Sequence, residues 1–140
     1  LLARAFEIKG EMKHNPFNDV QADKWYTEGI IALYEAGITS GRADGSFGVN
    51  DAITNEEISA MLYRTLTVLK MDLIDVNEQS INFKDEAKIS NYAKEAVQAL
   101  SKKGIVNGKP DGTFGPKDST SRAQVAVMLD RIFQLAAKSN

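Results

Sequence analysis

The side chain whose type and position could do the most specific chemistry in this sequence is Arg122, in the tetrapeptide Ser121-Arg122-Ala123-Gln124. This tetrapeptide fits the pattern S/T-x-x-E/Q, in which the first side chain caps a helix and the fourth reaches back to the chain. Ser121 and Gln124 are therefore predicted to be structural. Arg122 is then the first helical residue, expected to point outward beside unpaired N–H groups and the positive end of the helix dipole. A guanidinium there suits a carboxylate or phosphate; the alternative is an exposed arginine in a surface ion pair.

The same pattern occurs earlier, as Thr54-Asn55-Glu56-Glu57. Thr54 and Glu57 are predicted to cap a second helix in the same way. Here the outward position holds Asn55, followed by Glu56, whose charge should repel an anion. The sequence therefore predicts an anion site at the later helix start alone, with Asn55→Arg creating at most limited affinity.

Residues for catalysis are scarce in this chain. It has no cysteine and a single histidine, His14, in a polar stretch without a second metal ligand or nucleophile beside it. Histidine-based catalysis and most transition-metal sites need several side chains that converge on one point. We therefore expect no enzyme, no catalytic residue, no metal and no cofactor.

Charge and hydrophobic content narrow the function further. The 140 residues are 43% hydrophobic, with 17 basic and 19 acidic residues and a formal net charge of −2. This length and content favour one globular core. No basic run indicates nucleic-acid binding, and no apolar run approaches the length of a membrane span. Neither a nucleic-acid partner nor membrane insertion is expected.

The chain contains an internal repeat: residues 25–66 align with residues 92–133 at a constant offset of 67. Such fixed-period similarity is typical of repeat architectures. Residues 1–6 align in turn with residues 61–66, so the chain is predicted to begin inside the last helix of a preceding repeat. Many of the identical pairs are loop glycines or lie on one helix face, and they include Gly37/Gly104, Ile38/Ile105, Gly41/Gly108, Asp44/Asp111, Gly45/Gly112, Phe47/Phe114, Gly48/Gly115, Asp51/Asp118, Met61/Met128, Leu62/Leu129 and Arg64/Arg131.

Each repeat is predicted to fold as a helix, a glycine-rich loop and a second helix. The first helices are expected at residues 23–35, capped by Asp23, and at residues 91–103, with Gly37 and Gly104 as left-handed C-terminal residues. The second helices carry an apolar stripe with helical spacing, which suits packing around one shared axis. Its residues are Ile58, Met61, Leu62, Thr65, Leu66 and Leu69 in one repeat and Val125, Met128, Leu129, Ile132, Phe133 and Ala136 in the other.

Together these motifs resemble the S-layer homology (SLH) family of cell-wall anchoring modules. The resemblance covers nearly the whole chain. It rests on the openings Phe17-Asn18-Asp19-Val20 and Phe83-Lys84-Asp85, the aromatics Trp25 and Tyr92, the glycine-rich loops 37–47 and 104–116, and the two helix starts. It implies an all-α fold of helix–loop–helix repeats in a pseudo-threefold spindle around a central three-helix core. The implied boundaries are a terminal helix and linker of a truncated first repeat at 1–16, a second repeat at 17–66, a linker at 67–82 and a third repeat at 83–140.

The resemblance also implies a function, which is non-covalent anchoring of a surface protein to the bacterial cell wall, outside the cell. Its ligand would be secondary cell-wall polysaccharide that is anionic through pyruvylation, and self-association within a surface array is possible for such modules. Carried over residue by residue, the ligand arginine falls on Arg122 alone. The remaining implied glycan-binding positions are Trp25, Gly37, Arg42, Tyr92 and Gln124. A buried anchor at the helix start is the alternative role for Trp25, and helix termination the alternative role for Gly37.

The spacing of residues within the loops and the length of the repeats bear on two other possible functions. An EF-hand-like reading of Asp44-Gly45 and Asp111-Gly112 would place Arg42 and Lys109 at the third calcium ligand, where a cation opposes binding. We interpret Asp-Gly as turn chemistry instead. A helical-repeat scaffold that binds protein partners, or self-assembles, without glycan binding stays open as the alternative function, although repeats of that kind are shorter and have tighter turns.

Overall fold

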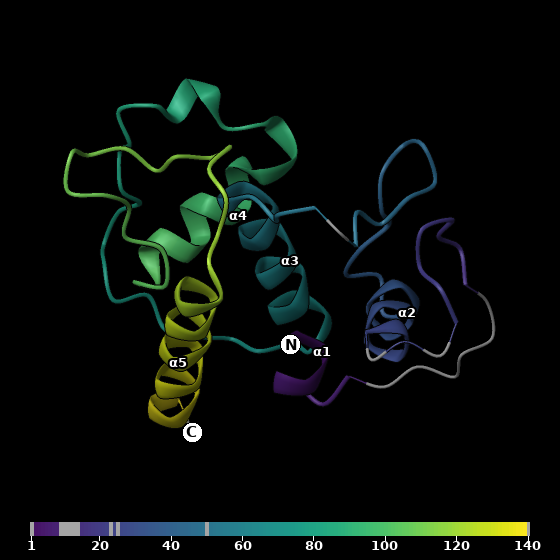
Figure 1. Ribbon diagram of the computed structural model, residues 1–140. Helices are drawn as coiled ribbons and strands as arrows, with labels where there is room; N and C mark the ends of the chain where they lie inside the picture. The colour runs from purple at the N-terminus through teal and green to yellow at the C-terminus, as the bar shows by residue number, and fades with distance from the viewer. Residues whose placement is uncertain (1, 9–14, 23, 25, 50, 140) are drawn as a thin grey trace. The chain divides into compact units, whose positions relative to one another are not determined.

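The computed structural model describes residues 2–8, 15–22, 24, 26–49 and 51–139 (Figure 1). His14, Asp23 and Trp25 lie outside these ranges, as do the side chains of Arg122 and Ala123. Within them the chain is all-α, as predicted, with no β-strand and a single bridge between Thr54 and Ser119. None of the described helices is both long and apolar enough to cross a membrane. The elements are α1 (Leu2–Ala5), α2 (Thr27–Glu35), α3 (Asn55–Val68), the 3-10 helix η1 (Glu86–Lys88), α4 (Asn91–Lys102) and α5 (Arg122–Ser139).

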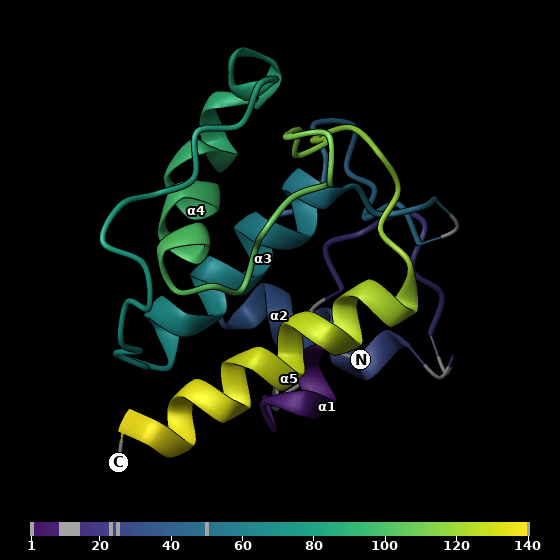
Figure 2. The same ribbon diagram turned by 90° about the vertical axis from the view of Figure 1, so that its left-hand side faces the viewer.

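The chain divides into two compact units, Leu1–Ala52 and Ile53–Asn140. The division falls inside the repeat predicted at 17–66, so each unit joins the second helix of one repeat to the first helix and loop of the next. In the first unit α1 contacts α2, and in the second unit α3 packs along α4 (Figures 1 and 2). The pseudo-threefold spindle concerns all three second helices together and stays a prediction.

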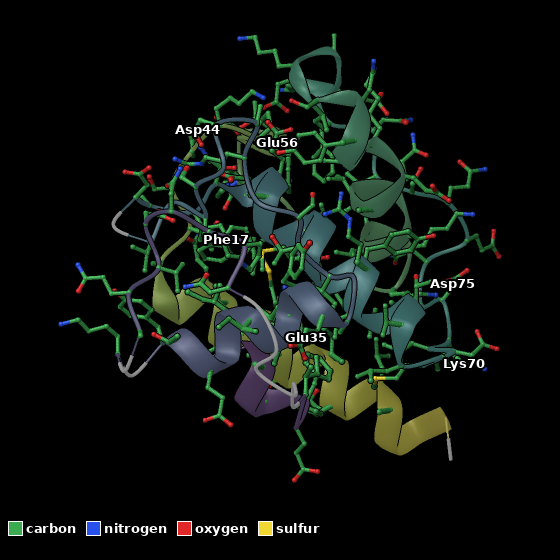
Figure 3. All side chains as sticks on the ribbon, turned by 90° about the vertical axis from the view of Figure 1, so that its right-hand side faces the viewer. Phe17, Glu35, Asp44, Glu56, Lys70 and Asp75 are labelled. Carbon is green, nitrogen blue, oxygen red and sulfur yellow. The ribbon has the colours of Figure 1, made fainter. Side chains whose placement is uncertain are left out.

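The first unit is built around Phe17. Its ring makes edge contacts with the rings of Tyr34 and Phe47, at centroid distances of 5.6 and 5.4 Å (Figure 3). The terminal helix is docked, because Leu2 and Ala3 are buried and the Ala3 Cβ lies 3.6 Å from the position of a Cβ on Gly29. The predicted remnant of a preceding repeat is thus helical over its first residues.

The start of α2 differs from the prediction. The helix begins at Thr27, and its N-cap residue Tyr26 makes no side-chain cap bond. The Thr27 hydroxyl is used in the preceding turn, where it donates to the Gln21 carbonyl (2.5 Å) and accepts from the Lys24 N–H (3.2 Å). The described helix therefore begins at Thr27 and not at the predicted residue 23.

The ends of α2 and α4 confirm the predicted glycine caps. Gly37 and Gly104 have φ of 81° and 72°, a left-handed conformation that side chains disfavour. After each glycine, the isoleucine N–H bonds five residues back, from Ile38 to the Leu33 carbonyl (2.9 Å) and from Ile105 to Leu100 (3.0 Å). This is the Schellman pattern, which satisfies carbonyls that a helix end leaves unpaired.

The second unit buries most of the predicted stripes. Leu62 and Ile132 have no exposed surface, whereas Leu69 and Phe133 remain 39% and 43% exposed. At these two positions the predicted apolar stripes therefore reach the surface. The buried stripe residues are Ile58, Leu62, Thr65 and Leu66 on α3 and Val125, Leu129 and Ile132 on α5.

The long connection between the repeats is bound to the C-terminal end of α4. The N–H groups of Val76 and Asn77 both donate to the Lys102 carbonyl at 2.9 Å. The Lys103 ammonium donates to the Leu73 carbonyl and pairs with Asp75, both at 2.9 Å. The connection thus satisfies carbonyls that the helix end leaves open.

Candidate functional site

Each glycine-rich loop is organised by one aspartate from the start of its repeat. The Asp19 carboxylate accepts hydrogen bonds from the N–H groups of Phe47 (2.7 Å), Gly48 (2.7 Å) and Val49 (3.0 Å). Asp85 accepts in the same way from Phe114 and Gly115, both at 2.9 Å. The sequence motifs contain both aspartates but do not predict this role, although their matching positions in the two repeats are a signal for it.

The Asp-Gly pairs in the loops are turns, as predicted. Asp44 accepts from the Ser46 N–H (2.9 Å) and hydroxyl (2.6 Å), and Asp111 accepts from Thr113 at the same two distances. These hydrogen bonds lower the pKa of both aspartates below the ordinary value. No group of three potential metal-ligating side chains converges in the described part of the chain.

Arg42, a candidate glycan-binding residue, lies in the loop of the first unit. It forms an ion pair with Asp51, and both side chains are about half exposed. In the second unit Lys109 pairs with Asp118 at the equivalent positions. This ion pair closes each loop, so Arg42 has a structural role in addition to the role that the resemblance implies.

Both predicted capping boxes are present. The Thr54 hydroxyl accepts from the Glu57 N–H (3.2 Å), and Glu57 accepts from the Thr54 N–H (3.1 Å). At the start of α5, the Gln124 N–H donates to the Ser121 hydroxyl (3.1 Å) and the Ser121 N–H donates to Gln124 Oε1 (2.8 Å). Arg122 is thus the first residue of α5, as predicted.

Removal of either cap is expected to lower stability. Thr54→Ala and Ser121→Ala should each reduce the free energy of unfolding by about 1 kcal/mol, the usual loss for an N-cap hydroxyl. Thermal melts would measure this, with exposed Ser119→Ala as a control near the wild-type midpoint. An unchanged midpoint for Ser121→Ala together with lost glycan binding would instead make Ser121 a ligand contact.

The start of α3 differs from the predicted open arrangement. Asn55 is 7% exposed, so its side chain does not point outward. Its amide donates to the Gly115 carbonyl (2.9 Å), and its Oδ1 accepts from the Thr120 hydroxyl (2.7 Å). The expectation that this side chain points outward is therefore wrong, because the loop of the next repeat covers it.

Glu56 is also buried, at 1% exposure (Figure 3). Its carboxylate accepts from the Ser90 N–H (2.9 Å) and hydroxyl (3.1 Å) and forms an ion pair with Lys117. Burial favours protonation of this carboxyl, but the bonds from Lys117 and Ser90 outweigh it, and the pKa of Glu56 is lowered. The Glu56 charge, which is predicted from the sequence to repel an anion, is instead paired with Lys117 inside the protein.

The remaining candidate residues are divided between the two units, with Gly37 in the first and Tyr92 and Gly104 in the second. Tyr92, in the first turn of α4, is 53% exposed. Partial burial and the nearby carboxylates of Glu56 and Glu57 raise the pKa of its phenol. Gly104 follows the other end of α4, about 18 Å away for a helix of this length, and Gly37 likewise follows the far end of α2. The structure does not bring these glycines to the helix starts.

Acid is expected to destabilise the protein through its paired carboxylates. The pKa values of Glu56 and Asp85 are lowered in the fold, so their contribution is present above their ordinary values and is lost as pH falls through the folded ones. The free energy of unfolding, measured in urea, should decrease below about pH 4.5. Asp85→Asn should flatten this dependence, and a wild-type stability that is constant down to pH 3 would contradict it.

Comparison with known proteins finds one matching family model and several similar proteins. The model of the S-layer homology domain family matches residues 16–58 and 82–126. An exoglucanase XynX of Acetivibrio thermocellus is 36% identical over 141 residues, covering 100% of this chain and 12% of the relative. A cellulosome-anchoring protein of the same species is 29% identical, covering 82% of this chain and 25% of the relative. An S-layer protein of Bacillus licheniformis is 28% identical, covering 87% and 13%. The chain thus spans no more than a quarter of any of these three relatives.

Proposed function

Since the chain belongs to the S-layer homology domain family, we propose that it anchors a larger protein to the bacterial cell wall by binding anionic, pyruvylated secondary cell-wall polysaccharide without a covalent bond. The family is a non-catalytic anchoring domain that binds cell-wall polymers. Its members among the relatives are S-layer and cell-surface proteins, and the location of this chain is extracellular, at the cell wall. The glucanase relative indicates that such a module can belong to an enzyme, so catalysis would come from other domains.

The observation that carries the proposal is the capped start of α5. The reciprocal bonds between Ser121 and Gln124 set the first turn, with Arg122 as its first residue. An arginine at that position adds a fork of N–H donors to the positive end of the helix dipole, and both favour a carboxylate. The exposed aromatic ring of Tyr92 supports a sugar contact elsewhere in the same unit.

Calorimetry with isolated wall polymer tests this function. We expect the intact chain to bind polymer that carries its acidic substituent and to bind weakly to polymer from which that substituent has been removed. Added salt should weaken the first interaction more than the second, because it screens charge. Equal affinity for both polymers would rule out the carboxylate mechanism.

The S-layer relative supports self-association as a second candidate, because its name describes a protein of a surface layer. Sedimentation of the isolated chain across a concentration series tests it. A constant monomer mass, together with polymer binding, would leave anchoring as the function of this segment.

A further inference from the structure

We propose that Asn107-Gly108 is a site of spontaneous deamidation, and that its isoaspartyl product loosens the glycine-rich loop of the second unit. Asparagine is a thermally labile residue, and a following glycine promotes its loss because no side chain shields the glycine nitrogen. This is the single Asn-Gly dipeptide of the chain. The inference goes beyond wall anchoring and does not depend on which ligand is bound.

The backbone nitrogen of Gly108 is free to react. Asn107 and Gly108 are both exposed, and among the described residues no hydrogen-bond acceptor is found for the Gly108 N–H. In the first repeat, the N–H of the equivalent Gly41 donates to the Thr39 hydroxyl at 3.3 Å. The position of Thr39 is held by Val106 in the second repeat. A methyl group thus replaces the hydroxyl, and the glycine N–H loses its partner.

The reaction needs no reagent except water. The Gly108 nitrogen gives up its proton to water and attacks Cγ of Asn107, so that a new C–N bond forms while the bond from Cγ to Nδ2 breaks. The amide nitrogen leaves as ammonia with that proton, and a cyclic succinimide remains. Water then opens the ring. Cleavage of the bond to Cγ gives aspartate, and cleavage of the bond to the backbone carbonyl carbon gives isoaspartate, which is the main product.

The side chain of Asn107 is weakly restrained before the reaction, and its hydrogen bond is lost after it. Nδ2 donates to the Gly104 carbonyl at 3.1 Å in an exposed hydrogen bond. One exposed bond between neutral groups restrains a side chain little. The carboxylate of either product has no proton to donate, and it stands near the C-terminal end of α4, where the helix dipole disfavours negative charge.

The two Asp-Gly dipeptides of the loops are protected from the same ring closure. In the second loop the N–H of Gly112 donates to the Lys109 carbonyl at 3.0 Å, so this nitrogen is engaged. The hydrogen bonds from Thr113 hold the pKa of Asp111 below its ordinary value. A carboxylate that stays ionised is a much poorer target for a nitrogen nucleophile than a neutral amide. The first loop has the same bonds at Asp44-Gly45.

The isoaspartyl product does not fit the loop. It inserts a methylene into the backbone ahead of Gly108, which is packed so closely that a Cβ on it would lie 2.5 Å from Phe83 Cε1 and 3.0 Å from the Thr113 carbonyl oxygen. The Phe83 ring is buried and packs on Phe114 at a centroid distance of 5.3 Å. The lengthened backbone therefore has to shift Gly108 or displace Phe83 from this contact.

Peptide mapping by mass spectrometry tests the site. The intact chain and two folded variants are aged for weeks in mildly alkaline buffer, and isoaspartate is identified by methyltransferase labelling. Asn107→Ser removes the reactive amide and copies the Ser40-Gly41 pair of the first repeat. Val106→Thr supplies the hydroxyl that Thr39 offers to the glycine N–H in that repeat. Circular dichroism confirms that each variant is folded.

We expect Asn107 of the wild type to lose its amide faster than Asp44 or Asp111 isomerises in the same sample. Asn107→Ser should give no product at that position, and Val106→Thr should slow the reaction. Asp-Gly sites that react as fast as Asn107 would overturn the proposal. A folded Val106→Thr chain that reacts at the wild-type rate would show that the unpaired N–H does not select the site.

Thermal melts of the aged samples test whether the loop is loosened. Aged wild type should melt lower than fresh wild type, by an amount that follows its isoaspartate content, whereas aged Asn107→Ser should keep its midpoint. Fresh Asn107→Asp carries the new charge without the extra methylene, and its midpoint should lie between those of fresh and fully modified chains. An aged wild type as stable as the fresh protein, or an Asn107→Asp variant as unstable as the isoaspartyl form, would overturn the backbone argument.

Discussion

Replacing Arg122 with alanine should weaken binding of the acidic wall polymer by about 1.5–3 kcal/mol, which is roughly a 10- to 150-fold loss of affinity. The range is that of hydrogen bonds to a charged group, because the proposed contact joins a guanidinium to a carboxylate. The fold should be unaffected, since the helix start is set by Ser121 and Gln124. Calorimetry at constant ionic strength measures the loss.

Lys88→Ala is the matched control for this prediction. Lys88 is an exposed cation in η1 of the same unit, so its removal changes the net charge equally. We expect its affinity to stay near that of wild type. If the two variants lose the same affinity, the polymer is attracted by overall charge and Arg122 makes no specific contact.

Replacing Glu56 with alanine should lower the free energy of unfolding of the second unit by about 2–4 kcal/mol. The substitution removes hydrogen bonds to a charged group and leaves the N–H of Ser90 without its acceptor, and losses from buried ionic networks are of this size. Urea denaturation followed by circular dichroism measures the change. The loss should exceed that of the cap variants, since the caps each involve a neutral hydroxyl.

Glu78→Ala serves as the control, because Glu78 is an exposed carboxylate in the connection. Exposed substitutions usually change stability by less than about 0.5 kcal/mol. A Glu56 variant within that range would mean that solvent replaces its partners at no cost, and that the contacts of Glu56 with Ser90 and Lys117 do not stabilise the fold.

Local patterns in the sequence predicted most of the helices correctly. The span of α4, the C-terminal glycines and both capping boxes depend on residues within about five positions of one another, and all are confirmed. The start of α2 was misplaced for a related reason. The hydroxyl of Thr27 bonds to Gln21 and Lys24 in a turn whose composition does not differ from that of a helix start.

Longer-range contacts could not be predicted from one sequence. Asn55 contacts residues 59 to 65 positions later, and Asp19 reaches a loop 28 to 30 positions later. A helical pattern shows which residues share a face, but not which distant loop covers a helix end. For that reason the Asn55 side chain is predicted from the sequence to point outward and Glu56 to repel an anion, whereas both are buried. The contacts of Arg122 and Trp25 with a glycan stay predictions.

The boundary between the two compact units falls inside the middle repeat, and this has a consequence for how the chain can be cut. The second helix of the middle repeat, α3, lies in the same unit as α4 and α5 of the last repeat, and not in the unit of its own first helix, α2. A cut at the repeat boundary near residue 66 would separate α3 from α4 and expose Leu62, whereas a cut between Ala52 and Ile53 keeps each unit whole. A shortened or transplanted version of this chain should therefore be cut between Ala52 and Ile53, in the glycine-rich loop region of the middle repeat, and not at the repeat boundary.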